Sequence, residues 1–290
     1  ILVIYGLWLS LVMAYARLPG WLVFPALILV TAWYLSLQHE LIHGHPTSNR
    51  RVNRLFGLLP LAVWYPYDVY LESHLAHHRD HLLTLPDIDP ESNYIQAQVF
   101  DAASPAWRAL WVGQRTTLGR FLTGPMLAIW HAHRLALSEN TLKHARRRLS
   151  WFQHWVLLGL LLWALWWACA IPPLTYMFGV AYPALGLAML RSFYEHRPAE
   201  LPAQRIVANE AAWPWRLLYL NNNFHVVHHE QPNLAWYRIP AVYWADRAGY
   251  LRRNGGFLLQ GYAGLLLRNG FKPVDSAVFP STAEGHRLPQ

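Results

Sequence analysis

Three short segments of the chain carry histidines at spacings that suit metal binding. They are His39-Glu-Leu-Ile-His43, His74-Leu-Ala-His77-His78 and His225-Val-Val-His228-His229. In a helix, residues three and four apart share a face, so each segment is expected to present its imidazoles in one direction. Neutral imidazole binds zinc, copper, iron and nickel. Eight such nitrogens exceed the needs of a single tetrahedral ion, which favours two metal ions.

Acidic side chains adjoin these histidines repeatedly. A ligating imidazole commonly donates its other N–H to a carboxylate, and two dications require countercharge nearby. We therefore expect five carboxylates to support the ligands: Glu40, Glu72, Asp80, Glu195 and Glu230. The remaining histidines lack the clustered spacing, and surface or hydrogen-bonding roles are expected for His45, His81, His131, His133, His144, His154 and His286.

The first segment also matches a different kind of enzyme. His39-Glu40-Leu-Ile-His43 fits the H-E-x-x-H pattern of zinc proteases, in which the glutamate is the general base. Such a site needs one further protein ligand and an open position, so it would leave the other two histidine segments unexplained. Metal content discriminates between the two interpretations.

The composition indicates a membrane protein. The 290 residues are 54% hydrophobic and include 16 Trp, which is too apolar for an ordinary soluble domain. The single cysteine, Cys169, excludes an intrachain disulfide and any cysteine-based zinc or iron–sulfur site. The formal charge of +8 lies largely beside apolar segments, where lipid orientation explains it, and no nucleic-acid-binding motif accompanies it.

Apolar segments predict an all-α integral membrane protein with four transmembrane helices in two hairpins. The spans are residues 1–16, 21–38, 155–171 and 174–190. Only Arg17 lies near a hairpin turn, whereas basic residues gather at the open ends of both hairpins, so the positive-inside rule places those ends in the cytoplasm: Arg50, Arg51, Arg54, Arg146, Arg147, Arg148, Arg191 and Arg197. Residues 39–150 and 191–290 then form a cytoplasmic helical cap that holds a histidine-rich dimetal site within one domain, 1–290.

This topology brings all three histidine segments to one side of the membrane. His196 follows the fourth span as His39 follows the second, which makes it a candidate ninth ligand. Residues 55–67 are expected to be re-entrant or interfacial, and residues 96–140 to form helices on the membrane surface. A metal transporter would carry polar ligands inside its spans, whereas the second, third and fourth spans contain no His, Asp or Glu.

At this point the chain resembles a known family, the membrane fatty acid desaturase and hydroxylase superfamily, over roughly residues 20 to 240. Asn223 to Pro240, with its proline and aromatic residues, is similar to that family's third histidine box, and His39 to His45 resembles the first box of bacterial members. The resemblance implies a non-haem di-iron centre that takes two electrons, activates O2 and removes hydrogen from an acyl chain. The iron ligands it implies are His39, His43, His74, His77, His78, His196, His225, His228 and His229.

One position departs from the family pattern. Structurally known stearoyl-CoA desaturases hold a metal through water with an asparagine one helical turn before the extra histidine, and Ser192 stands there in this chain. Asn221 or Asn222 is the expected substitute.

The expected function is desaturation of a fatty acyl chain by a multi-pass membrane enzyme whose active site faces the cytoplasm, in the inner membrane if the source is bacterial. A hydroxylase, a carotenoid ketolase and a decarboxylase that forms terminal olefins remain open. Electrons must come from an external ferredoxin, rubredoxin or cytochrome, because the chain has no redox-cofactor motif of its own. Candidates to line a substrate tunnel are Trp64, Tyr65, Trp236 and Tyr237.

Overall fold

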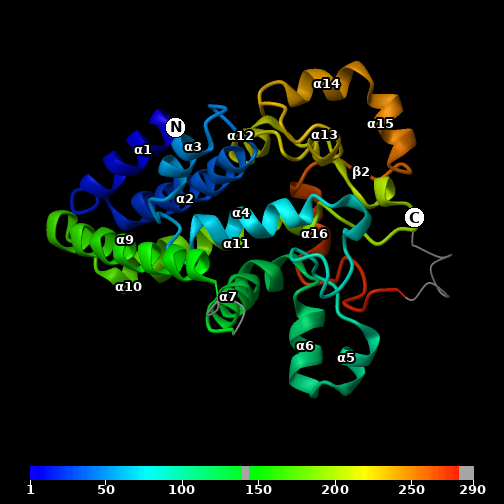
Figure 1. The fold of residues 1–290 in the computed structure, drawn as a ribbon, viewed down its shortest axis with the longest axis horizontal. Coiled ribbons are helices and arrows are strands. Elements are labelled where there is room, and N and C mark those ends of the chain that lie inside the picture. Colours follow the sequence, from blue (N-terminus) through cyan, green and yellow to red (C-terminus); the bar gives the residue numbers. More distant parts are fainter. Residues whose placement is uncertain (139–143, 281–290) are drawn as a thin grey trace. The chain divides into compact units, whose positions relative to one another are not determined.

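A computed structural model describes residues 1–138 and 144–280 and is mostly helical, as predicted (Figure 1). The chain divides into two compact units. Unit 1 comprises Ile1–Glu72 and Gly124–Ala188, and unit 2 comprises Ser73–Thr123 and Met189–Gln290. Three helices pass from one unit into the other along the chain: α4 (Tyr67–His77), α7 (Thr117–Ala136) and α11 (Tyr182–Phe193).

Unit 1 contains the long apolar helices. Its elements are α1 (Leu2–Met13), α2 (Gly20–Ile42), α3 (Arg50–Gly57), α9 (Ala145–Cys169), α10 (Pro173–Tyr176) and the π-helical segment η2 (Met177–Ala181). Three helical stretches are long and apolar enough to cross a membrane, namely α2, α9 and the continuous helix Pro173–Phe193. Helix α1 packs along α2 but has only 12 residues, or about 18 Å, against the roughly 30 Å of a bilayer core. The multi-pass character is therefore supported, and a fourth span stays a prediction.

The boundaries of these helices follow the local sequence. Helix α2 begins after the Leu18-Pro19-Gly20 break and runs past Gln38 to Ile42, so the first histidine pair lies at its end, as expected. Helix α9 begins ten residues before the predicted span and ends where Ala170 adopts a left-handed conformation ahead of two prolines. Exposed side chains on α9 include Trp163, Trp166 and Trp167, which suits a lipid-facing surface.

A non-helical segment follows α3 in unit 1, and side chains of three helices hold its backbone carbonyls. Gln38 donates to the carbonyl of Gly57 (2.9 Å), Tyr176 to Leu61 (2.8 Å) and the Nε2 of His154 to Val63 (2.9 Å). The hydroxyl of Tyr34 lies against the carbonyls of Gly57 and Leu59. Irregular backbone among apolar helices requires such partners, because each unpaired buried carbonyl costs free energy. These donors explain how residues 58–63, which follow the end of α3 at Gly57, can be packed among apolar helices without being helical.

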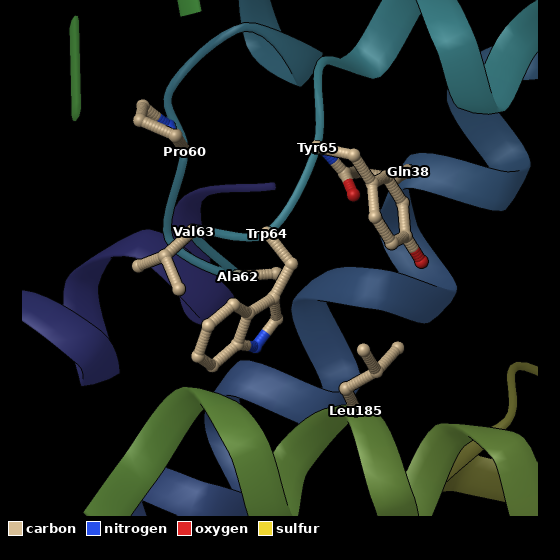
Figure 2. Close-up of a pocket in the computed structure, with 7 residues that line it drawn as sticks. All are labelled: Gln38, Pro60, Ala62, Val63, Trp64, Tyr65 and Leu185. Atoms are coloured by element: carbon tan, nitrogen blue, oxygen red, sulfur yellow. The ribbon is translucent and has the colours of Figure 1, made fainter. Parts of the chain in front are cut away.

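The same segment shapes a small pocket in unit 1 (Figure 2). The pocket has room for about one water molecule and is lined by Gln38, Pro60, Ala62, Val63, Trp64, Tyr65 and Leu185. Val63 has a positive φ of 56°, which turns the chain so that the buried Trp64 ring packs against Tyr182 of α11, with ring centroids 6.0 Å apart. Gln38, which lines this pocket, directly precedes the candidate ligand His39 in the sequence.

A buried ion pair fixes the start of α4 in unit 1. The guanidinium of Arg54 donates to both carboxylate oxygens of Asp68, at 2.8 and 2.7 Å, and the hydroxyl of Ser150 donates to one of them at 2.7 Å. Burial alone would raise the pKa of Asp68, but these donors hold it below its ordinary value. The carboxylate therefore links α3, α4 and α9.

Unit 2 is built from short elements around a compact core. They are η1 (Asp80–Leu82), α5 (Ala97–Ala102), α6 (Pro105–Gly113), η3 (Pro202–Arg205), β1 (Ala208–Asn209), α12 (Trp213–Leu218), α13 (His225–Glu230), α14 (Ile239–Ala245), α15 (Arg247–Arg253), β2 (Leu258–Leu259) and α16 (Ala263–Asn269). Strand β1 pairs in parallel with β2, with Ala208 opposite Leu258. Val226 and Val227 of α13 are buried in this core. Residues 97–136 are helical as expected, and their position on a membrane surface stays a prediction.

Replacing Asp68 is predicted to destabilise the protein because it leaves Arg54 and Ser150 without their acceptor. Asp68→Ala should cost about 2–3 kcal/mol, read as a lower Tm of thermal unfolding in detergent. The matched control is Glu72→Ala in the same helix. Glu72 pairs with Arg147 at 3.0 Å, but both side chains are more than a third exposed, so its loss should cost less than about 1 kcal/mol. Equal effects of the two substitutions would contradict this account.

Candidate metal centre

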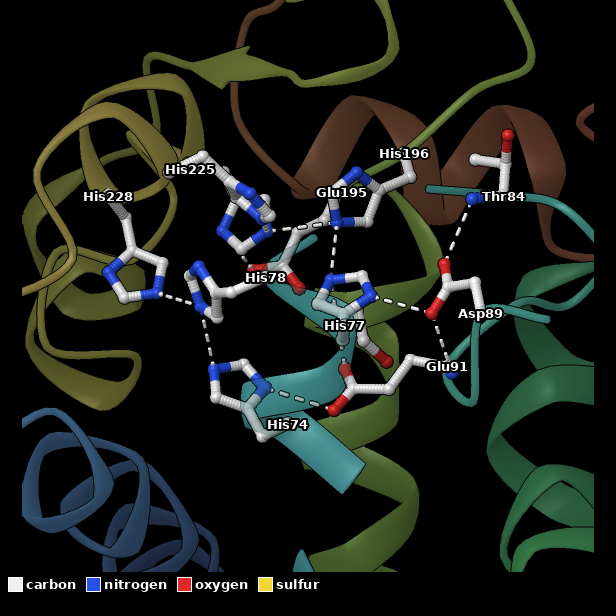
Figure 3. Close-up of polar contacts among 12 residues, drawn as sticks. His74, His77, His78, Thr84, Asp89, Glu91, Glu195, His196, His225 and His228 are labelled. Atoms are coloured by element: carbon white, nitrogen blue, oxygen red, sulfur yellow. Dashed lines mark hydrogen bonds and ion pairs between the residues drawn. The ribbon is translucent and has the colours of Figure 1, made fainter. Parts of the chain in front are cut away.

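Four histidine side chains of unit 2 converge in what we name the four-histidine cluster: His77, His196, His225 and His229. Their ligand-type nitrogens all lie within 4.8 Å of one another, and all but the half-buried His196 are buried. The Nε2 of His196 is 3.0 Å from the Nε2 of both His77 and His225, and the Nε2 atoms of His225 and His229 are 3.1 Å apart. Figure 3 shows the rings of His77, His196 and His225 turned toward a common point.

A second group in unit 2, the three-histidine cluster, consists of His74, His78 and His228. The Nε2 of His78 lies 3.1 Å from that of His74 and 3.1 Å from that of His228 (Figure 3). The predicted second and third histidine segments, with His196, therefore form two groups of nitrogens. The number of groups agrees with the expectation of two metal ions.

The histidines of the second and third segments are divided between the two clusters. His74 and His78, four residues apart, share the three-histidine cluster, whereas His77 belongs to the other. In α13 the pair four apart is His225 and His229, and His228 belongs to the three-histidine cluster. At 3.6 residues per turn, residue i+3 lies about 60° to one side of residue i and residue i+4 about 40° to the other. The structure thus corrects the expectation that each segment presents all its imidazoles in one direction.

Local packing explains how each segment holds its histidines. In α13 the intervening Val226 and Val227 are buried in the core of unit 2, which turns the histidines to the other face. Leu220 and Asn221 both have positive φ, and this turn precedes α13. His196 lies in an extended segment that bridges Ile206 in antiparallel fashion. Helix, core and bridge together bring distant parts of the sequence to one site.

The first histidine pair belongs to unit 1. His39 and His43 are buried at the end of α2, with their ring centroids 4.8 Å apart and the Nδ1 of His39 3.9 Å from a carboxylate oxygen of Glu40. Their spacing of four residues on a helix suits a shared ligand face. Their role as metal ligands stays a prediction.

Oxygen acceptors determine which nitrogen of the cluster histidines carries the proton. The Nδ1 of His77 is 2.9 Å from Asp89, that of His74 is 3.0 Å from Glu91, and that of His225 is 3.2 Å from the Oδ1 of Asn222. The Nδ1 of His196 lies 3.3 Å from the carbonyl of Arg205. Because these oxygens accept, each Nδ1 carries a hydrogen, and in the neutral form of each ring the Nε2 presents a lone pair.

Facing lone pairs make the clusters suitable for cations. The Nε2 atoms of His196 and His225 lie 3.0 Å apart, and two unprotonated nitrogens cannot hydrogen-bond to each other, so their proximity is unfavourable unless a positive charge lies between them. Neutral imidazoles grouped in this way suit a transition-metal ion such as zinc, copper, iron or nickel.

The pKa values follow from the same surroundings. Burial and the neighbouring imidazoles lower the pKa of His196, His225 and His229 well below the ordinary value, and lower that of His78 to about 3. These side chains are neutral at pH 7, which is the form that binds metal. Burial alone would also lower the pKa of His77, but Glu91, Asp89 and Glu195 raise it to about 9.

The predicted supporting carboxylates do not all lie beside the histidine clusters. Glu195 pairs with His225 and with Arg191, at 3.1 Å, and burial raises its pKa to about 7. Glu72 instead pairs with Arg147, and Glu230 with Arg253 at 2.9 Å. The side chain of Asp80 is outside the described part of the structure, and so is the whole of His286.

The asparagines suggested as substitutes also differ from one another. The Oδ1 of Asn222 lies 3.2 Å from the Nδ1 of His225, whereas Asn221 accepts from Arg216 and donates to the carbonyl of Trp236. Ser192 donates to the carbonyl of Met189 at 3.2 Å. Asn222 is thus the one of the two whose side chain bonds to a cluster histidine.

Sequence reasoning missed two acidic residues that contact the clusters. Asp89 and Glu91 are not among the five predicted supporting carboxylates, yet they bond to His77 and His74. They lie 12 and 17 residues along the chain from these partners, so no helical spacing relates them. The one available signal was a pair of carboxylates close after the second histidine segment.

Comparison with known proteins agrees with this geometry. A search of curated proteins finds no match for the chain. The fatty acid desaturase family matches residues 19–259, which include the nine candidate ligands and the three long apolar helices. The protein therefore belongs to the fatty acid desaturase family.

Proposed function

We propose that this protein is a membrane-bound di-iron oxidoreductase that uses O2 to desaturate fatty acyl chains. The observation that carries the proposal is the pair of histidine clusters with facing Nε2 atoms, in a chain that matches the desaturase family. In this proposal, His77, His196, His225 and His229 hold one iron, and His74, His78 and His228 hold the other. His39 and His43 complete the ligand set by their sequence pattern alone.

Iron bound at these clusters would supply O2 activation and the oxidising power to attack an unactivated C–H bond. The protein's own contribution is to hold neutral imidazoles in a fixed orientation and to keep water away. Most of the cluster histidines are buried, which supports that role. In the overall reaction, one CH2–CH2 unit, O2, two electrons and two protons become CH=CH and two water molecules.

Unit 1 is the proposed source of substrate contacts. Of the four aromatic residues suggested for a tunnel, Trp64 and Tyr65 line the small apolar pocket beside Gln38, and Tyr237 is 67% exposed. We therefore favour the segment containing Trp64 and Tyr65 as a wall against which an acyl chain lies. The lipid bilayer is the natural source of that chain, since three helices can cross it.

Hydroxylation is the closest alternative reaction. It takes the same O2, electrons and protons but yields an alcohol and one water molecule, so reductant consumption does not distinguish the two. Ketolase and decarboxylase activities would require the same metal centre, and only the product separates them. A zinc protease that uses His39 and His43 would leave the two clusters of unit 2 without a role.

We further propose that the site faces the cytoplasm and receives electrons from an acidic ferredoxin, rubredoxin or cytochrome. Support comes from the net charge of +8 and from exposed basic side chains in unit 2: Arg238, Arg252, Arg268 and Lys272. Such encounters are brief and depend on charge complementarity.

Metal and product analysis tests the assignment of the clusters. The purified protein, loaded anaerobically with Fe2+, is expected to hold about two irons per chain and to produce an alkene from a labelled acyl substrate with O2 and a reductant. His74→Ala and His77→Ala should each lose about one iron and lower turnover by at least about 100-fold. The control is His81→Ala, because His81 is exposed and outside both clusters. A single zinc, or full activity of His77→Ala, would contradict the proposal.

Salt dependence tests the proposed electron donor. Turnover with a soluble acidic donor should fall several-fold as ionic strength rises from about 0.01 to 0.15 M, because screening shortens the reach of charges. Turnover with a small uncharged reductant should change little, which controls for salt effects on the enzyme. A flat profile with the protein donor would argue against electrostatic docking.

A further inference from the structure

One loop of unit 2, residues Thr84–Glu91, contacts both histidine clusters. Its shape is unusual, since Thr84 and Asp87 have positive φ values of 66° and 63°. A β-branched residue such as Thr rarely adopts this conformation, so the surrounding contacts must hold it there. The carboxylate of Asp89 provides them by accepting from the backbone N–H of Thr84 and of Glu91, each at 2.9 Å.

The carboxylate that closes the loop also orients the four-histidine cluster. The Oδ1 of Asp89 accepts from the Nδ1 of His77 at 2.9 Å, and both side chains are only 2% exposed. With the backbone donors on the same carboxylate, Asp89 has little freedom to rotate. The ring of His77 is therefore fixed with its Nε2 toward the cluster.

The next acidic side chain serves the other cluster. The Oε1 of Glu91 accepts from the Nδ1 of His74 at 3.0 Å, which fixes that ring toward the three-histidine cluster. The Oε2 of Glu91 lies 4.0 Å from the Nε2 of His77, so the same carboxylate also places negative charge beside the four-histidine cluster. Figure 3 shows Asp89 and Glu91 meeting His77 and His74 from one side.

We propose that the Thr84–Glu91 loop couples the two metal sites, with Asp89 and Glu91 as positioning residues. Asp89 acts on the four-histidine cluster through His77, and Glu91 acts on both clusters, through His74 and through its charge near His77. The inference rests on the proposed function only in requiring that the two clusters bind metal. Loss of Glu91 then weakens both sites, whereas loss of Asp89 weakens mainly the four-histidine site.

The experiment is an anaerobic titration of the metal-free, full-length protein with Co2+, whose visible spectrum reports the coordination of each bound ion. Glu91→Ala should lower the affinity of both sites about 10- to 100-fold and alter both spectra, because the hydrogen bond to His74 and the charge near His77 are lost. Asp89→Ala should weaken the four-histidine site more than the three-histidine site, which Asp89 reaches only through the backbone N–H of Glu91. Glu91→Gln keeps an acceptor for His74 and should restore the three-histidine site while the four-histidine site stays weakened.

Controls separate positioning from general loss of structure. The matched control is Asp87→Asn in the same loop. The exposed side chain of Asp87 accepts from Gln96 and contacts no histidine in the described structure, and asparagine tolerates the left-handed conformation of this position, so the variant should bind two ions as wild type does. Size exclusion and circular dichroism identify variants that fail to fold, and Glu91→Gln, which is isosteric, serves if Glu91→Ala does not fold. Wild-type affinity at both sites in Glu91→Ala, or at the four-histidine site in Glu91→Gln, would overturn the coupling. If the wild type itself binds no Co2+ or Fe2+, the proposed function fails instead.

Discussion

The site depends on the direction in which its imidazoles carry their protons. Oxygen acceptors hold a hydrogen on the Nδ1 of His74, His77, His196 and His225, and the Nε2 lone pairs of the neutral rings are consequently directed inward. The Nε2 atoms of His196 and His225, 3.0 Å apart, would repel each other in the absence of a cation. The folded protein therefore stores an unfavourable arrangement that metal binding would relieve, and the surrounding core of unit 2 must be stiff enough to maintain it.

That stiffness comes from ordinary packing. Val226 and Val227 anchor α13 in the core, and the bridge between His196 and Ile206 fixes the extended segment after α11. The two clusters are interleaved along α4 and α13, since each helix supplies both. The separation between the clusters is thus set within a single turn of helix and not by a hinge or a long loop.

Helical periodicity places residues three and four apart near one another, so the sequence could predict that the histidines of the second and third segments gather. Three of the four predicted spans are long apolar helices, although α9 begins earlier than its apolar run because charged residues also continue a helix. Supporting residues were harder to predict. Glu72 and Glu230 neighbour histidines in sequence but pair with Arg147 and Arg253, because flexible acidic side chains near arginines form ion pairs. Asp89 and Glu91 reach their partners only through a loop with left-handed residues, which no periodicity reveals.

The segment between α3 and α4 is held through its backbone and not through its side chains. Its anchoring contacts from Gln38, Tyr176 and His154 end on main-chain oxygens, which every amino acid possesses. Pro60 and Ala62, which face the pocket, take no part in that anchoring. The bulk of these two side chains can therefore change while the path of the chain stays fixed, so the pocket can be reshaped without rebuilding the scaffold.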